Sequence, residues 1–191
     1  VSIVLDIDTI PWLQVATLAG HISEENFVEP LSLLGRWYNN AFLVVESNST
    51  GKHVCIMLPK SPFDYPRDML YHRDDWNTEK RKMSREVGWR THSGSRHILI
   101  GALADAIQDK TVLLLDKRTV DECLKLVYTD RGRVEAEHGE HDDHCFALAL
   151  ALIGAKCYPK AETPFPMSWE RRISPVPAQP DLPYKSSITG Y

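Results

Sequence analysis

The sequence predicts an α/β protein in which helices cover both faces of a mixed β-sheet. Two runs rich in β-branched residues open the chain at 2–8 and 13–22, and from residue 41 short apolar runs alternate with helix-periodic segments. Strands followed by alternating strands and helices are typical of a sheet packed between helical layers. The 191 residues, of which 43% are hydrophobic and 25% charged, suit one globular domain.

The N-terminal part predicts a hairpin, a helix and a central strand. Thr-Ile-Pro-Trp at 9–12 separates the first two runs, which favours an antiparallel hairpin. Ser23 has the position of an N-cap for an amphipathic helix that extends to about Tyr38. A turn and a continuously apolar run follow at 39–46, and such a run is typical of a strand covered on both faces. This strand ends at Glu46.

Shorter elements are predicted for the remainder of the chain. They are a short helix within 47–58, a polar insertion with a hairpin at 63–92, a helix at 96–110, a strand at 111–115, a helix at 117–128, a hairpin at 127–139 that turns at residues 130–132, and a last helix that begins at Asp142 and Asp143. Residues 1–158 are expected to form one domain. The stretch 159–191 is rich in proline and has little periodicity, which predicts a mostly extended C-terminal tail.

Composition and motifs exclude several classes of function. No apolar run reaches the roughly 18 residues of a transmembrane helix and no signal peptide opens the chain, so a soluble intracellular protein is expected. The four cysteines lack CxxC spacing, as is typical of buried free thiols in a reducing compartment. The chain has neither a P-loop nor a Gly-x-Ser-x-Gly motif. The net charge of -4 leaves the kind of partner open.

Three carboxylates stand at the ends of apolar elements. Glu46 ends an apolar strand, and Asp142 and Asp143 begin the most hydrophobic helix. Such groups can converge on one edge of a sheet and attract Mg²⁺ or Mn²⁺, which prefer oxygen ligands and can hydrolyse a phosphodiester as a two-metal site. Spacing alone favours the structural alternative, in which Asp142 caps the helix and Glu46 is a solvated strand end. One aspartate suffices as a cap, however, and the second carboxylate keeps the metal hypothesis open.

Histidines at the same helix start raise the alternative of zinc. His138, His141 and His144 recur at intervals of three residues. Zinc sites usually take His or Cys pairs at defined separation on firm elements. The adjacent aspartates suit a harder cation, so zinc is the weaker of the two metal hypotheses.

A basic stretch lies in the polar middle of the chain. Its cations are Lys80, Arg81, Lys82, Arg85, Arg90 and Arg96, interleaved with Trp76, Trp89 and His92. Basic and aromatic side chains in an irregular surface segment can follow a phosphate backbone. The same pattern is nearly as consistent with a solvated charged loop that binds nothing. We favour DNA binding over this alternative because a candidate hydrolytic site lies on the same chain.

Three stretches together resemble one family. They are WYNNAFLVVESNSTG at 37–51, GWRTHSGSRHILIGALADAI at 88–107 and GRVEAEHGEHDDHCFALALA at 132–151. In order and spacing they are similar to the nuclease domain of the large subunit of the DNA-packaging terminases of tailed phages. Each stretch alone is weakly diagnostic, whereas the set is specific and spans most of residues 1–158.

This resemblance implies an RNase H-like fold and a metal-dependent endonuclease that cuts concatemeric double-stranded DNA during genome packaging. It gives catalytic and metal-binding roles to Glu46, Asp142 and Asp143, with Asp142 favoured as the primary ligand of the pair and Mg²⁺ or Mn²⁺ as the cofactor. It also implies a location in the host cytoplasm, the portal protein and the small terminase subunit as partners, and an ATPase domain in the full-length protein.

The sequence departs from the family at its first acidic ligand. In the family this acid lies on a strand before the hairpin, whereas here the hairpin opens at residue 2. We therefore expect the family's first strand to be missing. Asp6 or Asp8 is an alternative first acid, although the spacing of these residues to the run at 13–20 fits the second strand better. The departure leaves two further hypotheses open: a non-catalytic module that docks on DNA or the portal, and another RNase H-like nuclease such as a resolvase.

Overall fold

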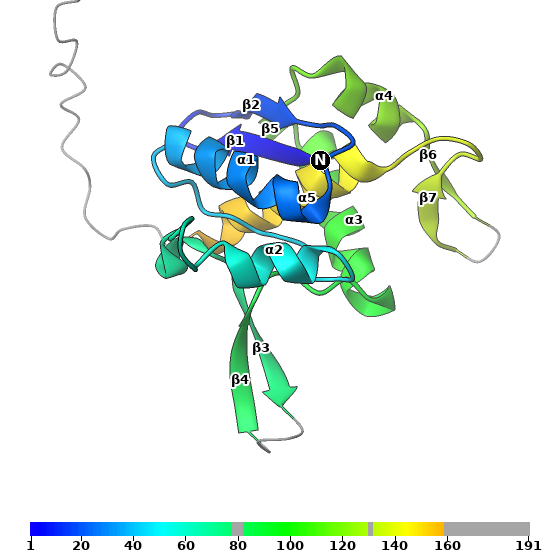
Figure 1. Cartoon of the computed structure of the whole chain (residues 1–191). Helices are drawn as coiled ribbons and strands as arrows, with labels where there is room; N and C mark the ends of the chain where they lie inside the picture. Colours follow the sequence, from blue (N-terminus) through cyan, green and yellow to red (C-terminus); the bar gives the residue numbers. More distant parts are fainter. Residues whose placement is uncertain (78–81, 130–131, 159–191) are drawn as a thin grey trace, which may run out of the picture. The chain divides into compact units, whose positions relative to one another are not determined.

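The predicted α/β class is confirmed in a computed structural model that describes residues 1–77, 82–129 and 132–158 (Figure 1). Its helices are α1 (Glu24–Trp37), α2 (Gly51–Met57), the 3₁₀ helix η1 (Arg67–Met69), α3 (Ser93–Gln108), α4 (Lys117–Leu124) and α5 (Asp143–Cys157). Its strands are β1 (Ser2–Asp6), β2 (Trp12–Leu18), β3 (His72–Asn77), β4 (Lys82–Val87), β5 (Val112–Leu113), β6 (Leu126–Tyr128) and β7 (Val134–Ala136).

The chain divides into two units, Val1–Tyr158 and Pro159–Tyr191. The extended tail predicted for 159–191 lies outside the described residues. Within the described part of the chain, no helix is long and apolar enough to cross a membrane.

The predicted N-terminal hairpin forms and carries a third strand. β1 pairs antiparallel with β2, and β5 joins β2 in parallel, in the order β1-β2-β5. Gln14 of β2 is buried, and its amide donates to the hydroxyls of Thr17 and Thr119, each at 3.0 Å. Because a buried amide requires hydrogen-bond partners, this pairing fastens α4, which carries Thr119, to the sheet.

The main hydrophobic core forms around α5. Leu148 and Leu152 of α5 are fully buried and share one cluster with Leu99 and Leu103 of α3 and Ile3 of β1. A helix that is apolar on all sides is typically buried in this way. The core therefore places the start of α5, with its two aspartates, at a fixed position relative to the sheet.

A second apolar cluster joins α1 and α2. Val28 and Leu31 of α1 share it with Val54 of α2 and with Tyr65. The Tyr65 hydroxyl donates to the carbonyl of Ala41 at 2.5 Å. These contacts anchor the start of the extended segment 42–47 that leads to Glu46.

The segment 42–47 differs from the central strand that the sequence predicts. It is extended, but it forms only isolated parallel bridges, Leu43 with Leu70 and Glu46 with Trp89. Its apolar side chains are half-buried, not buried. The described strands consequently form three separate sheets, β1-β2-β5, β3-β4 and β6-β7, and not the one mixed sheet that was predicted. A strand is central in a sheet only when both of its edges are hydrogen-bonded to other strands. Residues 42–47 form only isolated bridges, so the predicted single sheet is not formed by the described strands.

The two later hairpins form as predicted, but the helix before the last one is shorter than predicted. α4 ends at Leu124, and the residues from Leu126 to Tyr128 form β6, which pairs antiparallel with β7. Val127 and Tyr128 have side chains that favour strands over helices. The predicted turn at residues 130–132 includes 130 and 131, which lie outside the described residues.

Candidate functional site

A cavity of about 680 Å³ lies among β1, α1, α5 and residues 39–48. In Figure 1, β1 lies at the top of this group, and the light-blue segment that leads into α2 passes along its lower side. The polar residues that line the cavity include Asp6, Asp8, Glu46, Asn48 and Asp143. Together with Glu24 at the start of α1, carboxylates from four parts of the sequence thus share one cavity.

Glu46 is held by its backbone while its side chain stays exposed. The amide of Ser47 donates to the Trp89 carbonyl at 2.6 Å. α2 starts against the same point, because a Cβ added to Gly51 would collide with the Glu46 carbonyl oxygen. Glycine at position 51 is therefore required for the close approach that fixes the Glu46 backbone at the cavity.

Asn48 anchors the loop that follows Glu46. Its side-chain amide donates to the Thr91 carbonyl at 2.6 Å, and its side-chain oxygen accepts from the Thr91 amide at 3.0 Å. Two reciprocal hydrogen bonds to one backbone unit hold this loop against the approach to α3. The sequence analysis did not identify Asn48 as a site residue. Its position two residues after Glu46, at the end of a predicted strand, could have indicated a role in holding this loop.

The two adjacent aspartates at the start of α5 have different surroundings. Asp142 is the N-cap residue, yet its side chain makes no capping hydrogen bond. Its carboxylate accepts instead from the Arg96 guanidinium at 3.1 Å. Asp143 is exposed and lines the cavity, whereas Asp142 is not among the lining residues. The structure therefore places one carboxylate of the pair, Asp143, at the cavity and the other in an ion pair.

Arg96 connects α3 to both the β6-β7 hairpin and α5. Besides Asp142, its guanidinium donates to the Val134 carbonyl at 3.1 Å and lies over the Phe146 ring, 4.1 Å from the ring centroid. Side-chain exposure of 30% for Arg96 and 31% for Asp142 limits the ion pair to about 1 kcal/mol or less. The sequence placed Arg96 among the DNA-binding cations, and in the structure it holds the start of α5.

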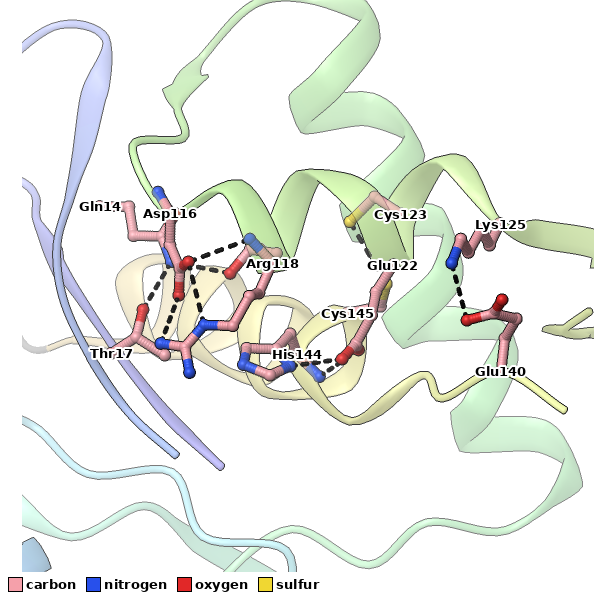
Figure 2. Close-up of polar contacts among 11 residues, drawn as sticks. Gln14, Thr17, Asp116, Arg118, Glu122, Cys123, Lys125, Glu140, His144 and Cys145 are labelled. Carbon is pink, nitrogen blue, oxygen red and sulfur yellow. Dashed lines mark hydrogen bonds and ion pairs between the residues drawn. The ribbon is translucent and has the colours of Figure 1, made fainter. Parts of the chain in front are cut away.

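The start of α5 is capped from another helix. The His144 amide donates to the Glu122 carboxylate at 2.8 Å, and His144 Nδ1 lies 2.5 Å from the second Glu122 oxygen (Figure 2). Glu122 belongs to α4, so a carboxylate at the positive end of α5 comes from 22 residues earlier in the chain. This partnership explains why neither Asp142 nor Asp143 is needed for side-chain capping.

Asp6 and Asp8 lie at the end of β1 that is remote from the chain start. The Asp8 amide donates to Asp6 Oδ1 at 3.0 Å, which is a local turn contact. In Figure 1 the chain start, marked N, lies beside the first turn of α5, and β1 runs away from it. Four residues along a strand span roughly 13 Å, so Asp6 lies about that far along β1 from Ser2.

The cavity carboxylates suit a divalent cation by type of donor, because Mg²⁺ and Mn²⁺ prefer carboxylate and amide oxygens. Among the residues that the structure describes, however, no group of three or more His, Cys, Asp or Glu side chains is placed to hold one ion. A closed site made only of protein ligands is therefore not formed by these residues. Cation sites of a more open type need only one or two carboxylates, which share the cation with water and substrate phosphates.

The three histidines considered for zinc are not brought together as ligands. His138 and His141 are exposed, while His144 is buried against Glu122. His144 therefore has a structural role at the start of α5, and the side chains of His138 and His141 face solvent.

The predicted basic segment is only partly described. Lys80 and Arg81 lie outside the described residues, and Lys82 begins β4. Arg85 of β4 and Arg90 are exposed. The β3-β4 hairpin projects away from the helices in Figure 1.

No protein-family model matches the chain. A search of curated proteins finds no match to it either.

Proposed function

We propose that this chain is a divalent-cation-dependent endonuclease domain that cuts double-stranded DNA, of the kind found in the large subunit of phage terminases. One observation carries the proposal: Glu46 and Asp143, which are 97 positions apart (143 - 46), line one cavity together with Asn48. Carboxylates at the end of an extended segment and at the start of a helix are the arrangement that the sequence resemblance implies. We assign the α/β unit to the RNase H-like folds on the same basis.

Glu46 and Asp143 are the proposed catalytic and metal-binding residues, with Mg²⁺ or Mn²⁺ as the cofactor. An exposed carboxylate pair beside a cavity leaves coordination positions for water and for phosphate oxygens of the substrate. When bound, the cation would supply Lewis-acid polarisation of a phosphodiester. The polypeptide holds the two carboxylates through the Ser47–Trp89 hydrogen bond and the Glu122 cap of α5.

The proposed substrate is duplex DNA, contacted through its phosphates. Arg85 and Arg90 are exposed near the β3-β4 hairpin, and Lys80, Arg81 and Lys82 belong to the same stretch of sequence. Cations that contact phosphates position the duplex without reading its sequence. The portal protein and the small terminase subunit are the further partners that the resemblance supports.

The experiment is cleavage of supercoiled plasmid by the purified chain with Mg²⁺ or Mn²⁺. We expect Glu46→Gln and Asp143→Asn each to lower the cleavage rate by about 100-fold or more, since Lewis-acid catalysis is worth several kcal/mol and each 1.4 kcal/mol is about tenfold in rate. Asp105→Asn removes an exposed carboxylate of α3 and is the matched control. Undiminished cleavage by both Glu46→Gln and Asp143→Asn would show that the site has been placed wrongly.

Asp6→Asn tests the other end of the cavity. We expect it to retain cleavage, because Asp6 lies at the far end of β1 and contacts its own turn. Loss of cleavage in Asp6→Asn with retention in Asp143→Asn would move the catalytic centre to that end.

A second candidate function is a non-catalytic module that docks on DNA or the portal. It is favoured by the lack of a three-ligand cation site among the described side chains. Duplex binding without cleavage at any Mn²⁺ concentration would support it. Cleavage that requires a four-way junction or a free end would instead indicate another RNase H-like nuclease, such as a resolvase.

A further inference from the structure

A second cavity, of about 260 Å³, lies between the start of α3 and β7. Its walls are formed by the first two turns of α3 with the two residues before that helix, and by the first residues of β7 with the residue before that strand. It has no described lining residue in common with the cavity of Glu46 and Asp143. The function proposed above therefore leaves this second cavity without a role.

Side chains that donate hydrogen bonds predominate in the walls of the second cavity. Among its described lining residues, six have such side chains: Thr91, His92, Ser93, Arg96, His97 and Arg133. Ile100 and Val134 are apolar, and Glu135 supplies a carboxylate. Two guanidinium groups and four further donors thus outnumber one acidic group, which favours an anionic ligand with several acceptor oxygens.

Two of these side chains have a buried polar atom that lacks a hydrogen-bond partner in the described part of the chain. They are Thr91, at Oγ1, and Arg96, at Nε. A buried donor without a partner is costly, because it has lost its contact with water and gained no replacement. Arg96 donates from Nη2 to the Val134 carbonyl and to Asp142, so its Nε–H can bind a ligand while the ion pair is kept.

His92 has one ring nitrogen left to donate. Its Nδ1 accepts from the amides of Gly94 and Ser95 at 3.2 and 3.4 Å. A ring nitrogen that accepts carries no proton, so in the neutral imidazole the proton lies on Nε2, which is then a donor. These hydrogen bonds occupy two of the first amides of α3, so a ligand in the cavity depends on side chains and not on the helix N-terminus.

Arg133 contributes a guanidinium from the β7 side of the cavity. Its side chain is exposed, and it has no hydrogen bond or ion pair with the described residues. Arg133 is therefore available to a ligand without the loss of a structural contact.

We propose that the second cavity is a binding site for a phosphate group, carried either by the DNA backbone or by a small free phosphate. The Arg96 Nε–H and the Arg133 guanidinium bind its oxygens from two walls, and the planar guanidinium fork matches the spacing of phosphate oxygens. The Thr91 hydroxyl and the His92 Nε2–H add neutral hydrogen bonds. A volume of 260 Å³ is below the roughly 300–1,000 Å³ of sites for drug-sized ligands, which favours a single small group.

A phosphate fits this cavity better than two other classes of ligand. A metal cation would be repelled by two guanidinium groups. A carboxylate has only two oxygens, whereas a phosphate has up to four and can accept from both walls at once. The Glu135 carboxylate opposes any anion, so we expect weak and reversible binding.

The DNA backbone as the source of the phosphate rests on the function proposed above. Thr91 is hydrogen-bonded to Asn48, which lines the first cavity, and Arg96 is paired with Asp142, the neighbour of Asp143. The two cavities are thus joined by direct contacts between their walls. A DNA strand that reaches Asp143 can place a neighbouring phosphate in the second cavity.

The test titrates the full chain with sodium phosphate, in the absence of metal, and with sodium chloride at equal ionic strength. NMR follows the Arg96 Nε–H signal and the Thr91 amide signal. Arg133→Gln removes one guanidinium from the cavity, and the matched control Arg67→Gln removes an exposed guanidinium of η1. Glu135→Gln removes the opposing carboxylate.

We expect the Arg96 and Thr91 signals to shift to saturation with phosphate and not with chloride. Arg133→Gln should raise the Kd for inorganic phosphate by about tenfold, since a charge-assisted hydrogen bond corresponds to at least about that factor. Glu135→Gln should lower the Kd, and Arg67→Gln should leave it unchanged. The proposal would be overturned by the absence of a saturable shift, by a Kd that Arg133→Gln raises no more than Arg67→Gln does, or by a higher Kd in Glu135→Gln.

A second titration distinguishes the two sources of the phosphate. A short DNA duplex, and the same duplex with neutral methylphosphonate linkages, are added in place of inorganic phosphate. If the DNA backbone is the source, the natural duplex shifts the Arg96 Nε–H signal, inorganic phosphate competes with it, and the neutral duplex has no effect. If inorganic phosphate alone shifts the signal, the site takes a small free phosphate. Because no metal is present, both results are independent of whether the chain cleaves DNA.

Discussion

At the residue scale, Asp142 and Asp143 differ although they are adjacent and chemically identical. Asp142 is paired with Arg96, and Asp143 lies at the cavity. The resemblance favours Asp142 as the primary ligand, whereas the geometry favours Asp143 for contact with a cation in the cavity. The two aspartates can therefore be separated experimentally through stability and metal response.

We predict opposite effects of Asp142→Asn and Asp143→Asn in thermal melts with and without Mn²⁺. Without metal, Asp142→Asn should lose the charged partner of Arg96 and melt lower by about 1–4 °C, as expected for a loss of up to about 1 kcal/mol in a chain of this size. Asp143→Asn should melt like the wild type. With Mn²⁺, the wild type and Asp142→Asn should gain stability by preferential binding to the folded state, and Asp143→Asn should not. The reverse pattern of metal response would make Asp142 the ligand.

Asp116 offers a pH-dependent test at the start of α4. Burial raises the pKa of this carboxyl, but hydrogen bonds from the backbone and side chain of Arg118 outweigh burial, so the pKa lies below its ordinary value (Figure 2). A lowered folded-state pKa contributes stability that is present above the unfolded value of about 3.9 and is lost as the pH falls through the folded value.

Asp116→Asn should therefore be less stable than the wild type at pH 7, by up to about 1 kcal/mol, because asparagine retains the cap but lacks the charge. The difference should shrink as the pH is lowered below about 4. Urea unfolding of both proteins across this range measures it. A difference that does not depend on pH would mean that the Asp116 charge contributes nothing to stability.

At the element scale, the contact between α4 and α5 joins two thiols. The buried Cys145 thiol donates to Cys123 Sγ at 3.3 Å (Figure 2). This hydrogen bond lowers the pKa of Cys123 and, together with burial, raises the pKa of Cys145. Cys55, by contrast, has its pKa raised to about 11 by burial. Since the thiolate is the reactive form, Cys123 is the more reactive member of the pair.

We predict that hydrogen peroxide converts Cys123 and Cys145 into a disulfide. The two thiols lose two hydrogen atoms, and one peroxide is reduced to two molecules of water. Peptide mapping by mass spectrometry should find this cross-link in the wild type and not in Cys123→Ser, with Cys55 unmodified. The cross-link should stabilise the α4–α5 contact by about 3 kcal/mol, a typical value for a loop of some 20 residues. Oxidation of Cys55 before Cys123 would contradict the reactivity order.

At the scale of the whole molecule, the net charge of -4 includes a basic stretch of sequence at 80–85, which contains Lys80, Arg81, Lys82 and Arg85 and no acidic residue. Replacing Arg81, Lys82 and Arg85 with alanine should weaken duplex DNA binding and reduce its salt dependence by about 0.9 in the log–log slope for each phosphate that is no longer neutralised. The control replaces three exposed lysines on other parts of the chain, Lys60, Lys110 and Lys156. If the triple variant and the wild type have equal salt-dependence slopes, the three replaced cations do not contact DNA phosphates and the hairpin is a solvated element.

Local sequence signals were sufficient to predict the α/β class, the N-terminal hairpin and the positions of α1, α3 and α5. These signals are the hydrophobic period, the β-branched runs and the residue types that begin a helix. The sequence also marked Glu46 and Asp143, because acidic residues at the ends of apolar elements stand out in the pattern. The nuclease activity and the RNase H-like assignment remain predictions.

Long-range packing determines which aspartate reaches the cavity, which residue caps α5 and how the strands pair. Asp142 is withdrawn by Arg96, and Glu122 supplies the cap from another helix. Residues 42–47 have the composition of a central strand, yet they are bonded along one edge among the described residues. Each of these outcomes depends on a residue that is distant in the sequence. A local sequence pattern indicates which types of partner a residue can pair with, but tertiary packing determines which of them is close enough to do so.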